Sequence, residues 1–272
     1  MDLGLQGKHA IVTGGSRGIG KAIARELARE GVDVAIVARN KTDLEVAARE
    51  LAAETNRRIL PLVADVTSKD QVDRMVADAA QQLGGVHILV NSGSAPGGSA
   101  SATGPIESVV DEDLLQDFNI KYVGALRCSR AVIPFMKKEN WGRIINISGA
   151  NARNAGNLSG GARNGALVHM TKTLAVQLGR YGITVNCIHP GTTRTERTPS
   201  LLAARAKQLG VSAEEAERQD FAPDSARGNA ICRMVDASEI AFVTAFLASE
   251  KAWAISGELV AATGGAGRNV YY

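Results

Sequence analysis

The chain has 272 residues, of which 45% are hydrophobic and 22% are charged. This usage is typical of a globular protein and excludes a disordered chain. The formal net charge is only +3 and the basic residues are scattered, so we expect no nucleic-acid surface. No apolar stretch approaches the roughly 20 residues that a membrane-spanning helix needs, so we expect no membrane contact.

The amino-terminal segment has neither a basic region nor a small-residue cleavage site, so the sequence predicts no signal peptide. The three cysteines, Cys128, Cys187 and Cys232, are widely spaced. This pattern fits reduced thiols and excludes a disulfide scaffold or a cysteine zinc site. No cluster of His, Asp and Glu has metal-ligand spacing, so we expect no metal. The sequence therefore predicts a cytoplasmic protein of enzyme size that acts on a small molecule.

Short β-branched runs alternate with long amphipathic stretches from the start of the chain. In order, the first half predicts a strand at 9–13, a helix at 18–30, a strand at 32–37, a helix at 41–55, a strand at 59–64, a helix at 69–83 and a strand at 87–91. The second half predicts a long helix at 111–136, a strand at 143–147, a helix at 158–180, a strand at 183–188, a helix at 238–248 and a closing strand at 257–262. Near-continuous apolar strands separated by helices indicate a parallel sheet covered on both faces. The expected fold class is α/β, a Rossmann-type doubly wound parallel sheet.

No repeat, low-complexity segment or linker interrupts this pattern, so we expect one dinucleotide-binding catalytic domain over residues 1–272. The stretch 195–236 breaks the rhythm with charged helical pieces around Pro199 and Pro223. An irregular segment of this length usually has a functional reason. We therefore predict that 195–236 is a substrate lid within the domain.

A glycine-rich turn joins the first predicted strand to the first predicted helix, and it is the strongest functional signal. Its residues are Thr13, Gly14, Gly15, Ser16, Arg17, Gly18, Ile19 and Gly20. Glycines allow a tight turn and the close approach of a diphosphate, whose charge meets free N–H groups at the helix start. Because the turn opens the first strand–helix–strand unit, it predicts dinucleotide binding.

The spacing Gly-x-x-x-Gly-x-Gly, with Asp65-Val66 after the third strand and Asn91-Ser92-Gly93 after the fourth, resembles the short-chain dehydrogenase/reductase family. Further matches are the segments 130–136, 142–148 and 185–191, so the resemblance spans essentially the whole chain. It implies that Asp65 and Val66 flank the adenine, that Asn91 holds the fourth strand, and that Ser92 and Gly93 lie along the cofactor. It also implies that the nicotinamide end is approached by Pro190, Gly191, Thr193 and Thr195.

The end of the second strand distinguishes the two nicotinamide cofactors. NAD enzymes usually place an acidic residue there, on the ribose 2′-hydroxyl. This chain has Arg39 and Asn40 instead, with Arg17 inside the glycine turn. Two guanidinium groups can clamp a 2′-phosphate through charge-assisted hydrogen bonds, although both arginines are also compatible with a plain solvated surface. We predict NADP(H) in preference to NAD(H).

The catalytic residues of the family are not plainly present. Members typically have an Asn on the long helix, a Ser after the fifth strand and a Tyr-x-x-x-Lys pair on the next helix. Alignment places Lys121 at the asparagine, Gly149 at the serine, Gly160 at the tyrosine and Asn164 at the lysine. Lysine and asparagine thus exchange places, which predicts an ammonium group near the nicotinamide ribose from a different helix. Alternatively, Lys121 is a solvated helix residue and Asn164 a neutral filler.

The proton donor cannot be identified from the sequence, and several side chains remain candidates. Ser148 and Ser159 have hydroxyls but need an activating partner, whereas Lys121 can donate a proton if desolvation lowers its pKa. Arg163 is essentially always protonated and suits the binding of an oxyanion or carboxylate. With Asn164, these residues form the predicted catalytic set. His189 precedes Pro190-Gly191 but fits a packed residue at a strand end better than a catalytic one.

Three functions fit this sequence. The first is an NADP(H)-dependent oxidoreductase that acts on a carbonyl, alcohol or enone with a rebuilt acid site. The second is a non-redox lyase or isomerase on the same scaffold, and the third is a catalytically silent nucleotide-binding subunit or sensor. The resemblance also implies a homo-oligomer, a tetramer or dimer, because family members commonly bury the long helix and the 158–180 helix between subunits.

Overall fold

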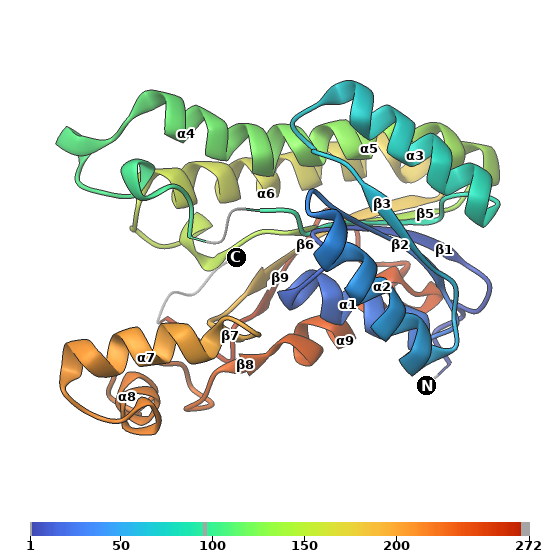
Figure 1. Ribbon diagram of the computed structural model, residues 1–272. Coiled ribbons are helices and arrows are strands. Elements are labelled where there is room, and N and C mark those ends of the chain that lie inside the picture. The colour runs from blue at the N-terminus through green and yellow to red at the C-terminus, as the bar shows by residue number, and fades with distance from the viewer. Residues whose placement is uncertain (1, 95–96, 268–272) are drawn as a thin grey trace.

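The structure, a computed structural model, describes residues 2–94 and 97–267 (Figure 1). Its centre is a seven-stranded parallel sheet in the order β3-β2-β1-β4-β5-β6-β9. The strands are β1 (His9–Thr13), β2 (Asp33–Ala38), β3 (Ile59–Val63), β4 (Ile88–Asn91), β5 (Gly142–Ile147), β6 (Ile183–Pro190) and β9 (Leu259–Ala262). The order reverses between β1 and β4, which is the switch point where open α/β sheets bind ligands. The predicted doubly wound parallel sheet is confirmed.

Helices cover both faces of this sheet (Figure 1). One layer holds α1 (Gly18–Arg29), α2 (Lys41–Thr55) and α9 (Ala237–Ala248), and the other holds α3 (Lys69–Leu83), α5 (Gly124–Glu139) and α6 (Leu158–Leu178). Each layer has its own apolar cluster, one around Leu27 and Ile240 and the other around Val132 and Leu174. The strands between them are buried on both sides, as their near-continuous apolar sequences require.

The long helix before β5 is interrupted by a wider turn that the sequence does not predict. It consists of α4 (Asp111–Phe118), a π-helical segment (Asn119–Val123) and α5. Lys121 is the buried residue of that π-helical segment. Single π-turns inside α-helices are rare and frequently occur at functional sites.

The irregular stretch after β6, residues 193–236, forms a small unit beside the sheet, which we call the annex (Figure 1). Its short strands β7 (Thr193–Arg194) and β8 (Val235–Asp236) pair in parallel, and α7 (Thr198–Leu209) packs on α8 (Ala213–Asp220). Arg205 holds the two helices together through hydrogen bonds of 2.9–3.2 Å to the Asp220 carboxylate. The annex is therefore an ordered unit built on the charged helical pieces that the sequence predicts.

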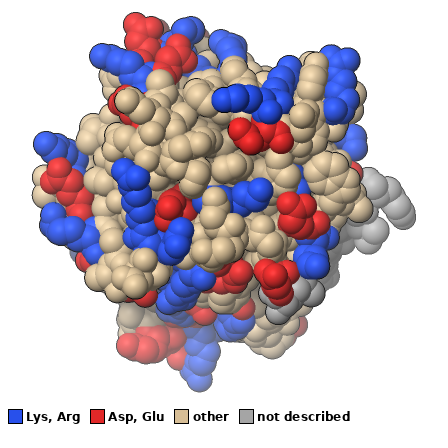
Figure 2. All heavy atoms as spheres, turned by 90° about the vertical axis from the view of Figure 1, so that its right-hand side faces the viewer, with Lys and Arg blue, Asp and Glu red and all other residues tan. Residues whose placement is uncertain are grey.

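Basic and acidic side chains are interspersed on the face of the molecule that Figure 2 shows, without a broad patch of one sign. None of the helices in the described part of the chain combines the length and apolar character needed to cross a membrane.

Candidate active site

A cavity of about 820 Å³ lies at the carboxyl ends of the strands and joins the glycine turn to the π-helical segment. The predicted cofactor residues that line it are Gly14, Ser16, Arg17, Gly18, Ile19, Gly20, Arg39, Asn40, Asp65, Val66, Ser92, Gly93, Pro190, Gly191, Thr193 and Thr195. The predicted catalytic residues that line it are Lys121, Ser148, Arg163 and Asn164. The fold thus brings most of the predicted set to one place.

The glycine turn has the geometry of an anion cradle. A Cβ atom at Gly20 would lie 2.3 Å from the Gly14 carbonyl oxygen, so any side chain there would force the turn apart. Gly14 and Gly18 both have positive φ angles, +70° and +58°. At the start of α1, the Gly18 amide donates a 2.9 Å hydrogen bond to the Glu196 carboxylate. A negatively charged group therefore already lies at the positive end of the helix dipole.

The adenosine end of the cavity is flanked by side chains of both signs. Arg39 is 70% exposed, and its guanidinium lies 3.9 Å from the Asp65 carboxylate. Asn40 caps α2 by accepting a hydrogen bond from the Asp43 amide, which fixes the chain just beyond β2. Arg17 is exposed at the edge of the glycine turn. Two exposed guanidinium groups therefore lie at this end of the cavity.

Asn91 holds the sheet together rather than facing the cavity. It is buried and donates hydrogen bonds to Asn146 (2.9 Å) and Ser129 (3.3 Å). Beside it, the Thr13 hydroxyl accepts hydrogen bonds from the Ser92 and Gly93 amides at 3.1 and 3.0 Å. These bonds keep the chain after β4 close to the glycine turn, where Ser92 and Gly93 line the cavity.

Lys121 is a buried cation at the other end of the cavity. Its Nζ donates a 3.1 Å hydrogen bond to the carbonyl oxygen of Ser148, just beyond β5. Burial, followed by the nearby positive charge of Arg163, lowers the pKa of Lys121 to about 7. No ion pair involves Lys121 within residues 2–94 and 97–267. An amine with this pKa exchanges protons readily at neutral pH.

Asn164 fills the space beside Gly149. A Cβ atom at Gly149 would lie 2.8 Å from Asn164 Nδ2, so the amide occupies the volume that a side chain at position 149 would need. The backbone carbonyl of Asn164 accepts a 3.1 Å hydrogen bond from the Ser148 hydroxyl. Its side-chain Oδ1 is buried without a hydrogen-bond partner among the described residues. Asn164 therefore presents an unsatisfied acceptor in a residue that lines the cavity.

Two asparagines that the sequence did not single out surround Gly160. A Cβ atom at Gly160 would lie 2.8 Å from Asn151 Nδ2 and 2.9 Å from Asn157 Oδ1. Asn157 is the N-cap of α6 and accepts a 2.6 Å hydrogen bond from the Gly160 amide. Asn151 lines the cavity from the loop after β5. Only the capping pattern could have identified Asn157, and no local signal identifies Asn151.

Ser159 does not line the cavity but anchors a buried carboxylate. Its hydroxyl donates a 2.6 Å hydrogen bond to Asp117, which is fully buried on α4. Ser99 adds hydrogen bonds from its amide (2.9 Å) and its hydroxyl (3.0 Å) to the same carboxylate. Asp117 lies one helical turn before Lys121, and its negative charge acts on Arg163. No local signal in the sequence identifies Asp117, because its partners come from distant segments.

His189 is a buried strand residue, as expected. Burial lowers its pKa to about 4, with smaller contributions from Arg153 and Lys121, so the imidazole is neutral. Tyr122 packs against Phe118, with ring centroids 4.9 Å apart, and does not line the cavity. Asn119 accepts a 2.9 Å hydrogen bond from Arg127 and also faces away. None of these three side chains lies at the candidate site.

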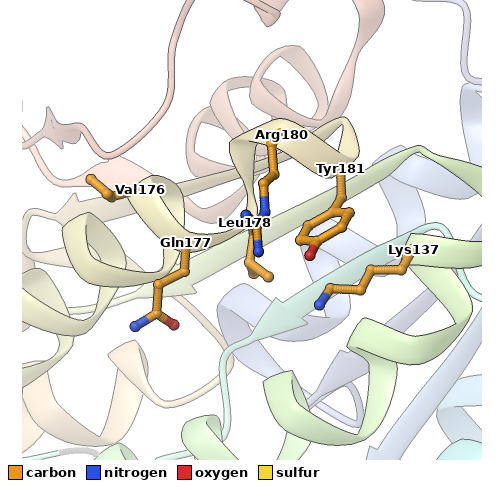
Figure 3. A pocket seen from close by; sticks show the side chains of 6 residues that line it. All are labelled: Lys137, Val176, Gln177, Leu178, Arg180 and Tyr181. Carbon is orange, nitrogen blue, oxygen red and sulfur yellow. The ribbon is translucent and has the colours of Figure 1, made fainter.

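A second hollow of about 460 Å³ lies between the ends of α5 and α6 (Figure 3). Lys137 Nζ lies 4.0 Å from the centroid of the Tyr181 ring, and the Arg180 guanidinium lies 4.8 Å from it. The two cationic side chains that line this hollow are therefore both in cation–π contact with the Tyr181 ring. The hollow is remote from the glycine turn, so the candidate active site is the larger cavity.

Comparisons with known proteins agree with this geometry. The family model for short chain dehydrogenases matches residues 8–206. The NADPH-dependent reductase BacG of Bacillus subtilis is 31% identical, and the match covers 97% of this chain and 99% of BacG. The short-chain reductase protein NovJ of Streptomyces niveus is 34% identical over 94% of this chain and 92% of NovJ. The crystal structure of L-sorbose reductase from Gluconobacter frateurii with NADPH and L-sorbose superposes with a TM-score of 0.91, at 30% identity, over 99% of this chain and 100% of that one.

Proposed function

Because the chain belongs to the short-chain dehydrogenase/reductase family, we propose that it is an NADP(H)-dependent oxidoreductase. It interconverts a carbonyl or enone with its reduced form and uses Lys121 as the proton donor. The observation that carries this assignment is the buried Lys121 ammonium, which lines the cavity and has a pKa of about 7. Brønsted behaviour makes such a group an efficient acid at neutral pH.

The residues of the glycine turn fit a dinucleotide. The turn excludes side chains where a diphosphate must approach, and the Gly18 amide accommodates a carboxylate at the start of α1. Arg17 and Arg39 would hold the 2′-phosphate of NADP(H). The similarity to BacG, which is named an NADPH-dependent reductase, and to L-sorbose reductase, whose structure contains NADPH, supports this choice. When bound, the reduced nicotinamide supplies the two electrons of the reduction by transferring a hydride to the substrate carbon.

We further propose that the chain lacks the Tyr-x-x-x-Lys pair of its family. Gly160 and Asn164 stand at the two positions, and the side chains of Asn151 and Asn157 fill the space beside Gly160. Lys121 approaches from the π-helical segment instead of from α6. The exchange of lysine and asparagine is thus a rebuilt acid site rather than a loss of function.

The residues around Lys121 have separate roles in the proposed reaction. The proton moves from Lys121 Nζ to the substrate oxygen, and solvent returns a proton to the amine. The Ser148 carbonyl holds Nζ in place. The Asn164 side chain orients the substrate oxygen, and the Ser148 hydroxyl supports it by donating to the Asn164 backbone carbonyl. Ser159 positions Asp117 and, through its charge, Arg163.

The segment 195–236 is proposed to cover the cavity as a lid. Thr195, Glu196, Arg197 and Leu201 from this segment line the cavity, and Glu196 contacts the glycine turn directly. Closure of such a segment excludes water around the transferred groups.

We also propose a cytoplasmic homo-oligomer, a tetramer or dimer, that uses α5 and α6 as subunit contacts. Val176 on α6 is an apolar side chain that is 76% exposed beside the hollow of Figure 3, and a second copy of the chain would cover it. Light scattering during size-exclusion chromatography tests this, and Val176→Glu should shift the mass toward a smaller species.

The function is tested by following NADPH absorbance while a panel of ketones, aldehydes and enones is added to the purified protein. NADPH should be consumed with at least one class, and Arg39→Asp should shift the preference from NADPH toward NADH. Nucleotide binding without turnover across the panel would favour a lyase, an isomerase or a sensor. An unchanged preference in Arg39→Asp would remove the NADP(H) assignment.

A further inference from the structure

We propose that Lys121 is also a nucleophile, which holds small aldehydes and ketones in the cavity as a covalent Schiff base. In the proposed reduction this residue only donates a proton. The covalent site is a second use of the same amine, and it needs neither the nicotinamide nor a hydride. Three features support it: the position of the amine, the charges around it, and nearby groups that suit the intermediates.

The Lys121 amine is buried and still reaches the cavity. The residue is 8% exposed and lines the cavity together with the apolar side chains of Ile120 and Ile147. Its Nζ donates a 3.1 Å hydrogen bond to the Ser148 carbonyl oxygen, and it belongs to no ion pair among residues 2–94 and 97–267. Because no carboxylate retains the proton, its loss frees a lone pair for attack on a carbonyl carbon.

The groups packed around Lys121 favour the neutral amine. Burial, followed by the positive charge of Arg163 on α6, lowers the pKa of Lys121 to about 7, and only Cys187 on β6 opposes this shift. Burial raises the pKa of the Cys187 thiol to about 11 and lowers the pKa of His189 to about 4, so both groups are uncharged at neutral pH. A desolvated lysine beside another cation is a recurring arrangement for Schiff-base chemistry.

The charged groups on the two adjoining helices are engaged elsewhere. Asp117 on α4 accepts hydrogen bonds from Ser99 and Ser159, and its charge acts on Arg163 rather than on Lys121. Arg127 on α5 donates to the Asn119 side chain at 2.9 Å. Neither helix therefore supplies an anion that would hold Lys121 in its ammonium form.

The covalent step balances without any further reactant. The amine lone pair attacks the carbonyl carbon, the carbonyl π electrons move to oxygen, and a proton shifts from nitrogen to oxygen to give a carbinolamine. The carbinolamine takes up a proton and loses water while the nitrogen lone pair forms the C=N bond. Overall, the carbonyl compound and the ammonium become a protonated imine and water, with no change of oxidation state. Hydrolysis reverses the step and releases the carbonyl compound.

Two polar groups beside Lys121 suit these intermediates. The Ser148 carbonyl, which accepts a hydrogen bond from the amine, can accept one from the N–H of the protonated imine. Asn164 lines the cavity at 6% exposed, and its buried Oδ1 has no hydrogen-bond partner in the described structure. The carbinolamine hydroxyl can donate to this oxygen, whereas a carbonyl cannot. The Ser148 hydroxyl donates to the Asn164 backbone carbonyl, which keeps the two groups together.

The test traps the imine in the purified full-length protein at pH 7, without any nicotinamide nucleotide. Butanone is the probe, and sodium cyanoborohydride reduces an imine to a stable secondary amine. Peptide mapping by mass spectrometry then gives the labelling rate of each lysine. At pH 7 an amine with a pKa of about 7 has a neutral fraction on the order of 1,000-fold larger than an ordinary lysine, with its pKa of 10.5.

Lys121 should therefore be labelled faster than Lys138, an exposed lysine of α5, by about 10-fold or more. A less basic amine is a weaker nucleophile, which offsets part of the difference in neutral fraction. In concentrated urea the ratio of the two rates should fall toward one, because the folded cavity is lost. Asn164→Ala should slow the labelling of Lys121 by about 5-fold and leave that of Lys138 unchanged. Thermal melting checks that this variant folds.

The outcomes separate the covalent site from the proposed reductase. Preferential labelling of Lys121 in the folded protein supports the covalent site, whether or not NADPH is consumed in the turnover assay. NADPH oxidation without labelling of Lys121 overturns the covalent site and leaves the reductase intact. Equal labelling of Lys121 and Lys138 in the folded protein, or a preference that persists in urea, also overturns it.

Discussion

A buried cation lies near each end of β5, and the two are held in different ways. Near the beginning, Arg143 is fully buried, with its guanidinium 4.2 Å from the Trp141 ring and 5.0 Å from the Trp253 ring. It also donates to the backbone carbonyls of Gly142 (2.9 Å) and Ser249 (3.5 Å). Just beyond the other end, Lys121 has the Ser148 carbonyl as its hydrogen-bond acceptor and borders the cavity.

This difference separates a structural cation from one that can exchange a proton. Burial lowers both pKa values, that of Arg143 to about 10 and that of Lys121 to about 7. Arg143 therefore stays charged at neutral pH, and the Glu250 carboxylate at 3.9 Å, together with the aromatic rings and carbonyls around it, compensates the charge. Lys121 loses its proton near neutrality and faces a space where a substrate can receive it. This placement agrees with a general property of open parallel sheets, which bind ligands at the carboxyl ends of their strands. Lys121 lies at that end of β5, and Arg143 lies at the opposite end.

The largest expected effect is on turnover. Lys121→Met removes the proposed proton donor, so the rate of NADPH oxidation should fall by about 100-fold or more. NADPH affinity, measured by calorimetry, should change much less. Lys138→Met, at an exposed position on α5, is the matched control and should retain the wild-type rate. An undiminished rate in Lys121→Met would exclude Lys121 as the donor.

The same pair of cations predicts opposite effects on stability. Lys121→Met removes a group whose pKa is about 7 in the folded protein, compared with 10.5 for a free lysine side chain. Each pKa unit corresponds to about 1.4 kcal/mol, so the free energy of unfolding of the variant should rise by about 5 kcal/mol and its Tm by about 10–20 °C at pH 6. Arg143→Met loses its ring contacts and hydrogen bonds, and its Tm should fall by about 5–10 °C.

The pH dependence of these melting temperatures provides the control. The folded protein binds fewer protons than the unfolded chain between the two pKa values of Lys121, so this group's contribution to stability rises with pH across that window. The stability that Lys121→Met gains over the wild type should therefore be largest below pH 7 and should decrease as the pH rises toward 10.5. Melting curves at pH 6 and pH 9 measure it. A gain that does not shrink would contradict the low pKa.

Much of the fold was predictable, because its signals are local. Apolar strands and capped helices follow one another along the chain, and the glycine turn identifies the first strand–helix unit without any tertiary contact. The π-helical segment at Lys121 was not predictable, since its sequence differs little from that of a regular helix. Asp117 and Glu196 were missed because their hydrogen-bond partners, Ser99 and Gly18, lie 18 and 178 positions away along the chain. Asn151 was missed because only the folded loop after β5 brings it beside Gly160.

A smaller but sharper effect is expected in the pH profile of catalysis. Reduction needs the Lys121 ammonium, so its kcat should fall about 10-fold per pH unit above the pKa of about 7. Alcohol oxidation needs the neutral amine and should rise through the same region. His189, whose pKa is about 4, contributes nothing to this window. Profiles of kcat in both directions test the assignment, and a reduction rate that stays flat from pH 6 to pH 9 would contradict it.

The smallest predicted effect concerns the glycine turn, where the site holds a carboxylate rather than a cation. Glu196 accepts a hydrogen bond from the Gly18 amide, which is one of the groups that would bind the diphosphate. The incoming nucleotide must therefore displace a negative charge from the start of α1. Glu196→Gln keeps the size of the side chain and removes the charge, so calorimetry should find NADP⁺ affinity raised by about 2- to 5-fold at low salt.

The salt dependence distinguishes this competition from a simple loss of structure. Screening weakens interactions between exposed charges, so the advantage of Glu196→Gln should decrease as the ionic strength rises. Glu214→Gln, an exposed acidic residue of α8, is the matched control and should leave the affinity unchanged. If Glu196→Gln instead weakens NADP⁺ binding, the carboxylate supports the bound state of the annex. The contact would then help to close the lid over the cofactor rather than compete with it.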